Sequence, residues 1–587
     1  MLDLRAHGCQ LTGVYLTPSF RVPLELPIDR SEPMTDRLSI AVAQINPTVG
    51  DVAGNIALIE SYAAQAAEKG ADLMVATELA VSGYPPEDLV LKEAFQDRIE
   101  DAVTALAGRL KERKCPAVLV GAPWRVDGHL YNAALLLDDG EIKHIRLKHE
   151  LPNYGVFDEK RVFATGPLPG PIPFRDVRLG VMVCEDLWFP DVAECLQESG
   201  AELLISLNGS PFDMDKVDVR LNTAIARTTE TGLAQLYVNQ VGGQDELVFD
   251  GGSFVVNADY KMVMRAPFWS EALVMTDWQR TDHGWACAGA GTQASLSEEE
   301  NVYQAMTLGL RDYVGKNGFP GVVIGLSGGI DSALSAAVAV DALGADKVLA
   351  VMMPSPYTSA ESLEDAEACA NMLGIHLEDI NIGPAMGAFE QMLAPVFEGR
   401  DPDITEENIQ ARSRGLLLMA ISNKLGHMVL TTGNKSEMSV GYATLYGDMC
   451  GGYSVLKDVY KTMVFRLSHW RNAHQPPGVL GPGGRVIPER IITKPPSAEL
   501  RPDQKDQDSL PPYDELDGIL GALIEDEKSV DDVVALGYDV QTVKRIWKLL
   551  DRAEYKRRQA PPGVKITLRA FGKDRRYPIT NGFTKQI

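Results

Sequence analysis

The amino-acid sequence predicts an α/β protein built from two large domains. Short apolar runs alternate with segments of helical periodicity along both halves of the chain, which is the pattern of strands covered by helices. The chain has 587 residues, too many for a single hydrophobic core. We therefore expect an N-terminal extension over residues 1–35, a first domain over 36–285 and a second domain over 286–587.

Composition and charge exclude several classes of protein. The formal net charge of −25 argues against a general nucleic-acid or membrane-surface binder. No apolar run reaches the roughly 18 residues that a membrane-spanning helix needs. Seven cysteines at irregular spacing, with no Cys-x-x-Cys pair, indicate free thiols in a reducing compartment and no structural zinc. We expect a cytoplasmic protein with no membrane or nucleic-acid partner.

One segment near the C-terminus has the opposite charge. Residues 548–576 contain ten Lys or Arg and three Asp or Glu, which gives a net charge of +7. Two interpretations of this segment are open. It is either a solvated basic tail or a strip that closes over phosphate groups.

The first half shows strands and helices in regular succession. A helix is expected over 55–69, where apolar residues recur on one face. Strands are expected over 38–44, 71–77, 117–122, 179–183, 203–207 and 236–240.

Three polar side chains stand at the ends of strands in this half: Glu78, Lys148 and Cys184. Singly, each has an ordinary structural explanation, because a cysteine after a strand usually fills a core and a lone charge usually faces solvent. Together, with their flanks at 77–85, 148–154 and 183–188, they resemble the nitrilase, or carbon–nitrogen hydrolase, family. This resemblance extends over most of the first half.

The resemblance implies a glutamine-hydrolysing site. Cys184 would attack the side-chain amide of glutamine, and the ammonium of Lys148 would lower the thiol pKa and stabilise the oxyanion. Glu78 would act as general base, first for Cys184 and later for water. The residues that would bind glutamine are Tyr154, Ser210 and Lys216.

The second half opens with a helix expected over 298–314 and an apolar strand over 321–324. The strand runs into a loop rich in glycine and hydroxyl groups, and a helix is expected to begin at Ala333. Such a loop binds anions, because its backbone N–H groups and the helix dipole attract them and its glycines let a phosphate approach. Asp331 offers a hard oxygen ligand for Mg²⁺. The loop residues are Gly325, Leu326, Ser327, Gly328, Gly329, Ile330, Asp331 and Ser332.

Further strands and helices alternate after this loop. Strands are expected over 348–353 and 377–382, with a helix over 361–373 between them and another strand beginning at Met428. This succession predicts a parallel, doubly wound sheet, whose ligands bind at the carboxyl ends of the strands. The loop at 325–332 lies at that edge of the sheet.

These motifs resemble a second known group of enzymes. The loop is similar to the Ser-Gly-Gly-x-Asp-Ser loop of ATP pyrophosphatases, and Thr-Thr-Gly-Asn-Lys-Ser-Glu at 431–437 is similar to a motif of NAD synthetases. With both halves joined, residues 36–587 resemble the glutamine-dependent NAD synthetase family. The implied fold is an N-terminal nitrilase-like α-β-β-α sandwich followed by a doubly wound ATP-pyrophosphatase domain.

The resemblance also implies roles for residues of the second half. The loop 325–332 and Thr432 would bind ATP, and Asp331 and Glu437 would hold Mg²⁺. Lys461 and Ser497 would lie near the phosphates. The residues that would contact the deamido-NAD substrate are Asn408, Glu437 and Lys556.

The implied reaction joins the two halves. Ammonia released from glutamine would displace AMP from a deamido-NAD adenylate, giving NAD, AMP and pyrophosphate in the last step of NAD biosynthesis. Because ammonia is mostly protonated near neutral pH, we expect a tunnel from Cys184 to the adenylate site and coupling of the two activities. The substrates are small molecules, and the family precedent for assembly is a homo-octamer.

Two alternative functions are compatible with parts of this sequence. GMP synthetase, asparagine synthetase and tRNA-thiolating enzymes share the phosphate loop but act on other acceptors. The net charge of −25 argues against an enzyme that binds tRNA. The Glu78–Lys148–Cys184 set argues against GMP and asparagine synthetases, whose glutaminase halves lack it. The first half could instead be an inert scaffold or oligomerisation module, against which its intact Glu78, Lys148 and Cys184 argue. Release of glutamate from glutamine distinguishes the scaffold from the glutaminase.

Overall fold

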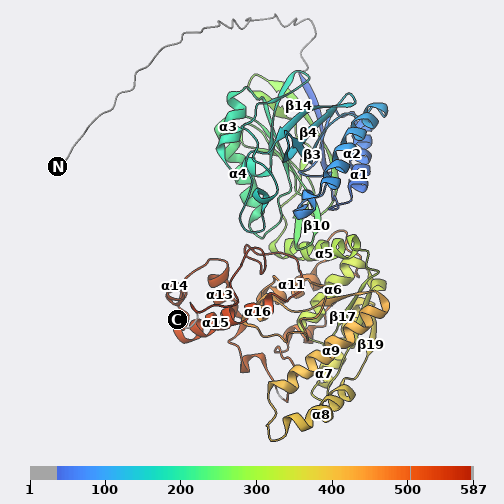
Figure 1. Cartoon of the computed structure of the whole chain (residues 1–587), viewed down its shortest axis with the longest axis vertical. Coiled ribbons are helices and arrows are strands. Elements are labelled where there is room, and N and C mark those ends of the chain that lie inside the picture. The colour runs from blue at the N-terminus through green and yellow to red at the C-terminus, as the bar shows by residue number, and fades with distance from the viewer. Residues whose placement is uncertain (1–35, 503, 584–587) are drawn as a thin grey trace, which may run out of the picture.

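The computed structural model describes residues 36–502 and 504–583. The extension expected over residues 1–35 lies outside these described residues. Figure 1 shows two bodies stacked along the long axis, with the blue and green first half above the second half, which runs from yellow-green to red. None of the helices in the described ranges is both long and apolar enough to cross a membrane.

The first half contains two seven-stranded sheets and a separate hairpin of β10 (Val241–Gln244) and β11 (Leu247–Asp250). The first sheet has the strand order β15 (Gly284–Cys287), β14 (Ala272–Thr281), β1 (Arg37–Gln44), β2 (Leu73–Val75), β3 (Ala117–Val126), β4 (His129–Asp138) and β5 (Glu141–Leu147). The second sheet has the order β16 (Gly291–Thr292), β13 (Met262–Arg265), β12 (Phe254–Val256), β9 (Gln235–Asn239), β8 (Leu203–Asn208), β7 (Val177–Val183) and β6 (Ile172–Phe174).

Helices cover the outer face of each sheet (Figure 1). Helices α1 (Val52–Glu68) and α2 (Glu93–Glu112) cover the first sheet, and α3 (Pro190–Glu198) and α4 (Lys216–Thr231) cover the second.

Alternating side chains along the strands create these layers. On β1, Ile40 and Val42 belong to the core between the two sheets, whereas Ala41 belongs to the core beneath α1 and α2. Another core, which includes Leu204 and Leu196, lies between the second sheet and helices α3 and α4. The period of two along a strand therefore gives each sheet two apolar faces. The α-β-β-α sandwich predicted from the sequence is confirmed.

The sandwich continues beyond residue 285, where we expected the first domain to end. Strand β15 crosses that position, and Gly291 and Thr292 of β16 still pair with β13. Helix α5 (Glu298–Lys316) then begins the second half and packs against the β10–β11 hairpin. We therefore place the boundary between Thr292 and Glu298.

The second half is organised around a parallel sheet with the order β19 (His376–Asp379), β18 (Val348–Met352), β17 (Val322–Gly325), β20 (Met428–Thr431) and β21 (Tyr453–Ser454). The chain leaves β17 toward β18 and β19 on one side, and later returns to β20 on the other side. The strand order thus reverses between β17 and β20. In open α/β sheets this reversal opens a crevice for ligands at the carboxyl ends of the strands.

Both faces of this sheet are covered, which confirms the doubly wound prediction. Val322 and Ile324 face the core formed with α5, α6 (Ile330–Leu343), α7 (Ala360–Leu373) and α11 (Lys461–Ala473). Val323 faces the opposite core, formed with α8 (Gly383–Phe397) and α9 (Ile404–Leu425). Helix α6 begins at Ile330 rather than at Ala333, so Asp331 and Ser332 lie in its first turn.

The C-terminal part adds short helices and the basic segment 548–576. Arg557 and Arg575 both pair with Glu554, at 2.8 and 3.1 Å, and Lys565 pairs with Asp574 at 3.2 Å. These three basic side chains are buried, whereas Arg552, Arg558, Lys573 and Arg576 are exposed, so the segment is not a uniformly solvated tail. The remaining helices are α10 (Lys435–Val440), α12 (Glu489–Thr493), α13 (Tyr513–Ile524), α14 (Val530–Ala535), α15 (Val540–Arg552) and α16 (Glu554–Arg557).

Two candidate active sites

Lys148 stands between two buried carboxylates in the first half. Its Nζ lies 2.7 Å from Oε1 of Glu78 and 2.9 Å from Oε2 of Glu159. Glu78 follows β2 and Lys148 follows β5, so both come from strand ends of the first sheet. Burial by itself disfavours the ammonium, but the two carboxylates outweigh it and hold the pKa of Lys148 well above its usual value. Lys148 therefore stays charged.

Glu78 is oriented by neighbouring donors as well as by Lys148. Its Oε1 accepts a hydrogen bond from Nδ2 of Asn132 (2.8 Å), and its Oε2 accepts one from the backbone N–H of Gly209 (2.8 Å). Only glycine fits at position 209, because a Cβ there would lie 2.9 Å from the ring of Tyr84 and 3.2 Å from Oε2 of Glu78. The carboxylate of Glu78 is thus fixed in one orientation.

Cys184 is buried and lies at the end of β7, in the second sheet, where it opens a short 3₁₀ helix (Cys184–Leu187). Its φ angle of 44° is left-handed, which costs a residue other than glycine about 1–3 kcal/mol and is most often seen at functional sites. Burial and the charge of Glu78 outweigh the opposing effect of Lys148 and hold the pKa of Cys184 well above its usual value. Lys148 does lower this pKa, as expected, but its effect is smaller than that of burial and Glu78, so the thiol needs a base.

Two of the residues expected to bind glutamine border the turn that carries Cys184. The hydroxyl of Tyr154 donates to Oε1 of Glu185 at 3.0 Å, and Glu185 directly follows Cys184. Nζ of Lys216 lies 4.9 Å from the ring centroid of Trp188, in the same turn. Burial lowers the pKa of Lys216 and raises that of Glu185. A carboxylate and an ammonium, which suit the two charged groups of an amino acid, thus lie next to the thiol.

Ser210, the third of these residues, is buried beside the base. It follows Gly209, whose backbone N–H binds Glu78. Its Oγ accepts a hydrogen bond from Nε of Arg220 at 3.0 Å, and Arg220 pairs with Asp250 at 2.6 Å. Arg220 and Asp250 therefore fix Ser210 in place.

Two residues of this site, Glu159 and Asn132, were not predicted from the sequence. Glu159 stands among Asp158, Lys160 and Arg161, and nothing in that charged run distinguishes it. Asn132 could have been predicted as a site residue, because it is an amide inside the apolar strand β4 and a buried amide needs hydrogen-bond partners.

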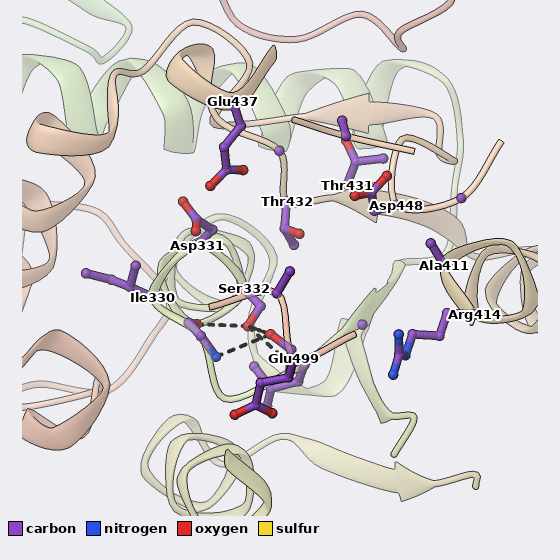
Figure 2. Close-up of a pocket in the computed structure, with 18 of the residues that line it drawn as sticks. Ile330, Asp331, Ser332, Ala411, Arg414, Thr431, Thr432, Glu437, Asp448 and Glu499 are labelled. Carbon is purple, nitrogen blue, oxygen red and sulfur yellow. Dashed lines mark hydrogen bonds between the residues drawn. The ribbon is translucent and has the colours of Figure 1, made fainter. Parts of the chain in front are cut away.

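A cavity of about 350 Å³ lies at the carboxyl edge of the parallel sheet of the second half, and this volume is within the range of small-molecule sites. Figure 2 shows the carboxylates of Asp331 and Glu437 pointing toward each other at one side of it, with Thr432 between them and Arg414. None of the basic side chains of 548–576 lines this cavity, so the cavity does not support the interpretation of a strip over phosphates. The lining includes Gly325, Leu326, Ser327, Gly329, Ile330, Asp331, Ser332, Thr432, Glu437, Lys461 and Ser497.

The glycine loop is shaped by its own hydroxyl groups and by helix α7. The Oγ of Ser332 donates to the carbonyl of Gly329 at 2.9 Å, and the N–H of Gly329 donates to Oγ of Ser327 at 3.2 Å. Gly328 has a φ of 76°, and a Cβ there would lie 2.2 Å from the carbonyl oxygen of Ser362 in α7. This glycine therefore permits the approach of α7 and does not line the cavity, whereas the sequence predicted that it lets a phosphate approach.

A single cation reaches the carboxylates of both Asp331 and Glu437. Nζ of Lys461 is ion-paired with Asp331 and lies 3.0 Å from Oε1 of Glu437. Burial raises the pKa of Glu437 to about 7, because Lys461 offsets this effect only in part and Asp331 adds to it. Two oxygen donors that share one cation fit Mg²⁺ when phosphate oxygens complete its coordination. Asn434, which donates to Oδ1 of Asp331 at 2.9 Å, was not singled out from the sequence.

Asn408 and Lys556 do not line the cavity. Nζ of Lys556 donates to the carbonyl oxygens of Gly441 (2.8 Å) and Ala443 (2.6 Å), and Oδ1 of Asn408 accepts from the hydroxyl of Thr444 (3.0 Å). Ala443 belongs to the cavity wall. Both residues therefore bind the segment that forms this wall, on its side away from the cavity.

Comparisons with known proteins identify a family for each half of the chain. A family model described as carbon-nitrogen hydrolase matches residues 39–284, and one described as NAD synthase matches residues 302–560. A glutamine-dependent NAD(+) synthetase of Rhodobacter capsulatus is 51% identical over 555 residues, which cover 94% of this chain and 100% of that protein. One of Thermotoga maritima is 43% identical and covers 94% of this chain and 100% of its own length.

Solved structures show the same arrangement. A glutamine-dependent NAD+ synthetase of Acinetobacter baumannii, solved in complex with ADP, matches with a TM-score of 0.74 and 43% identity, covering 93% of this chain and 99% of that one. One of Cytophaga hutchinsonii, at 23% identity, shares the fold with a TM-score of 0.78 over 94% of this chain and 99% of its own. With relatives above 40% identity along nearly its whole length and a family model for each half, the chain belongs to the glutamine-dependent NAD(+) synthetase family.

Proposed function

We propose that this protein converts deamido-NAD to NAD, using ATP for activation and glutamine as the source of nitrogen. The observation that carries the proposal is the presence, in one chain, of a buried Glu78–Lys148–Cys184 site and a phosphate-loop cavity with paired carboxylates. The A. baumannii relative was solved with ADP, which supports an adenine nucleotide as ligand of this cavity.

The reaction products test this proposal directly. Incubation with ATP, Mg²⁺, glutamine and deamido-NAD should give NAD, glutamate, AMP and pyrophosphate in equal amounts. Formation of ADP and orthophosphate would contradict cleavage at the α-phosphorus. Failure to use deamido-NAD, with activity toward another carboxylate, would favour a different acceptor.

In the first half, Glu78 is positioned to receive the thiol proton of Cys184. The sulfur attacks the amide carbon of glutamine, and the charged Lys148 stabilises the oxyanion that develops. Glu78 passes the proton to the nitrogen, the C–N bond breaks and ammonia leaves a thioester on Cys184. Glu78 then takes a proton from water, whose oxygen attacks the thioester and releases glutamate.

In the second half, the N-terminus of α6 and the hydroxyls of Ser327 and Ser332 form the phosphate cradle. A carboxylate oxygen of deamido-NAD attacks the α-phosphorus of ATP, pyrophosphate leaves, and ammonia then displaces AMP from the acyl carbon. Lys461 keeps positive charge beside the reacting phosphates. Mg²⁺, held by Asp331 and Glu437, would neutralise phosphate charge there.

The β10–β11 hairpin connects the two sites. Leu247 of the hairpin lines a small cavity together with Tyr84 and Glu159 of the glutaminase site. The neighbouring Glu246 forms an ion pair of 2.6 Å with Lys457, which lines the phosphate-loop cavity. We propose that ammonia passes along this hairpin, since two consecutive residues reach both sites.

We predict that Glu246→Gln makes the transfer of ammonia leak. The substitution keeps the shape of the side chain but removes the charge that holds the hairpin tip to Lys457. With unlabelled glutamine and ¹⁵N-ammonium both present, the fraction of NAD carrying ¹⁵N should rise above that of the parent protein, and more than one glutamate should form per NAD.

The matched control is Asp259→Asn, which removes a similar ion pair with Lys261 in another turn of the same domain. It should leave the isotope ratio unchanged. If free ammonium already enters NAD as readily as glutamine nitrogen in the parent protein, transfer through a protected route is rejected.

We also propose that the protein is cytoplasmic and forms a homo-oligomer, an octamer by family precedent. All six cysteines in the part of the chain that the structure describes are free, which supports a reducing compartment. Met392 and Val396 of α8 are 62% and 69% exposed, and such apolar side chains are commonly covered by another subunit.

A further inference from the structure

We propose that Asp186 is a positioning residue of the glutaminase reaction: its buried carboxylate fixes the segment that carries Lys148 against the turn that carries Cys184. The inference rests on the proposed glutamine hydrolysis and adds a residue to it. Nothing in the assignment of Glu78, Lys148 and Cys184 explains how these three groups keep their separation.

The catalytic groups come from two different sheets. Glu78 and Lys148 follow strands of the first sheet, whereas Cys184 follows β7 of the second sheet. Strands β5 and β7 belong to separate sheets, so ladder hydrogen bonds do not set the distance between Lys148 and Cys184. The two sheets meet through side chains, and a side-chain link must therefore hold the nucleophile in register with the ammonium.

Asp186 provides this link through both of its oxygens. Its Oδ1 accepts hydrogen bonds from the backbone N–H groups of His149 (2.9 Å) and Glu150 (2.8 Å), the two residues after Lys148. Its Oδ2 accepts one from the backbone N–H of Val183 (3.0 Å), the residue before Cys184. The side chain is fully buried, so these bonds are not shared with solvent.

Arg146 completes the link from the other side. Its Nη2 donates to Oδ2 of Asp186 at 2.9 Å, and its Nε donates to the carbonyl oxygen of Val181 in β7 at 2.9 Å. Arg146 lies in β5 of the first sheet and is 4% exposed. Each sheet thus contributes one charged side chain that binds backbone of the other sheet.

The strained backbone conformation of Cys184 also depends on Asp186. The left-handed φ of Cys184 is a conformation that a cysteine adopts only when its surroundings impose it. Asp186 binds the residue before Cys184 and lies in the same 3₁₀ turn, so it imposes that conformation locally. Asp186 contacts backbone on both sides of the site and acts through Lys148 and Cys184.

The test is Asp186→Asn in the full-length protein. An amide oxygen at position 186 can still accept from His149 and Glu150, but an amide nitrogen would face the donors of Val183 and Arg146. The attachment to the nucleophile turn is lost while the volume is kept. We expect kcat for glutamine hydrolysis to fall about 100-fold, the cost of a small misplacement of a catalytic group. We expect KM for glutamine to change less than about threefold.

Two measurements separate positioning from damage to the fold. NAD synthesis from ammonium should be unchanged in Asp186→Asn. Glu202→Gln is the matched control, because Glu202 also joins the two sheets, through Arg280 at 2.5 Å, and has no contact with the catalytic groups. It should keep the parent kcat for glutamine.

The proposal is overturned if Asp186→Asn keeps the parent kcat, if KM rises as much as kcat falls, or if Glu202→Gln loses as much activity. If Asp186→Asn does not fold, Arg146→Lys decides the question, since it keeps the charge but removes the Nε–Val181 bond. It should lower kcat about tenfold with KM maintained, and a parent-like kcat would reject the link. Absence of glutaminase activity in the parent protein would instead reject the proposed function.

Discussion

Replacing Cys184 with alanine should stop NAD synthesis from glutamine and leave synthesis from added ammonium intact. The thiol is the nucleophile proposed for amide cleavage, and Glu78 and Lys148 have no other group to activate at that turn. Removal of a catalytic nucleophile lowers kcat by roughly 10³-fold or more. Glutamate release should fall below detection, while the phosphate-loop cavity, built entirely from the second half, keeps its lining. Parallel assays with glutamine and with ammonium chloride measure both outcomes.

The matched control is Cys195→Ala. Cys195 is a half-buried thiol in α3, near Cys184 in the sequence, and its Sγ lies 3.6 Å from the backbone carbonyl of Pro169. This variant should still synthesise NAD from glutamine and from ammonium. Loss of both activities in Cys184→Ala would show that the thiol supports the fold of the whole chain, and the division of labour between the two halves would be wrong.

Strand ends were the part of the molecule that the sequence predicted best. Apolar runs locate strands well, and parallel strands bring their carboxyl ends to one edge, so the loop 325–332 was expected there, and the family resemblance placed Thr432 beside it. The cavity lining confirms that they do. The same reasoning placed Glu78 and Cys184 at the ends of β2 and β7.

Residues that act from a distance in sequence were harder to predict. Glu159 reaches Lys148 only because the loop after β5 folds back, and no periodic pattern encodes that return. The pKa of Cys184 depends on how burial, Glu78 and Lys148 balance, which requires their separations. Gly328 needs its missing side chain because of α7, a contact that local sequence does not show.

The basic segment 548–576 illustrates the limit of charge counting. A net charge of +7 in an acidic chain suggested an exposed or phosphate-binding strip. In the structure, Arg557, Arg558 and Arg575 all pair with Glu554, and Arg557 and Arg575 are buried, so part of the positive charge lies inside the C-terminal region. Charge content predicts a partner only when the side chains are known to face solvent.

Asp331→Asn should give the reverse of the Cys184 variant: no NAD from either nitrogen source, with glutamine hydrolysis retained. An amide at position 331 removes one of the two negative charges that Lys461 balances. It also removes a hard ligand for Mg²⁺ beside the phosphates. Loss of one such electrostatic contact at a phosphoryl-transfer site costs about 100-fold or more. Pyrophosphate release, measured with ammonium and with glutamine, reports the loss.

The contrast with an ordinary charge change makes the result specific. Asp346→Asn, an exposed aspartate after α6 in the same domain, should behave as the parent protein. If Asp331→Asn kept synthesis from ammonium, Asp331 would have no part in activating the carboxylate. If it lost glutamine hydrolysis as well, the glutaminase site would depend on the charge in the synthetase cavity. In that case the Glu246–Lys457 ion pair, which joins the hairpin to the cavity wall, would be the first contact to test for this dependence.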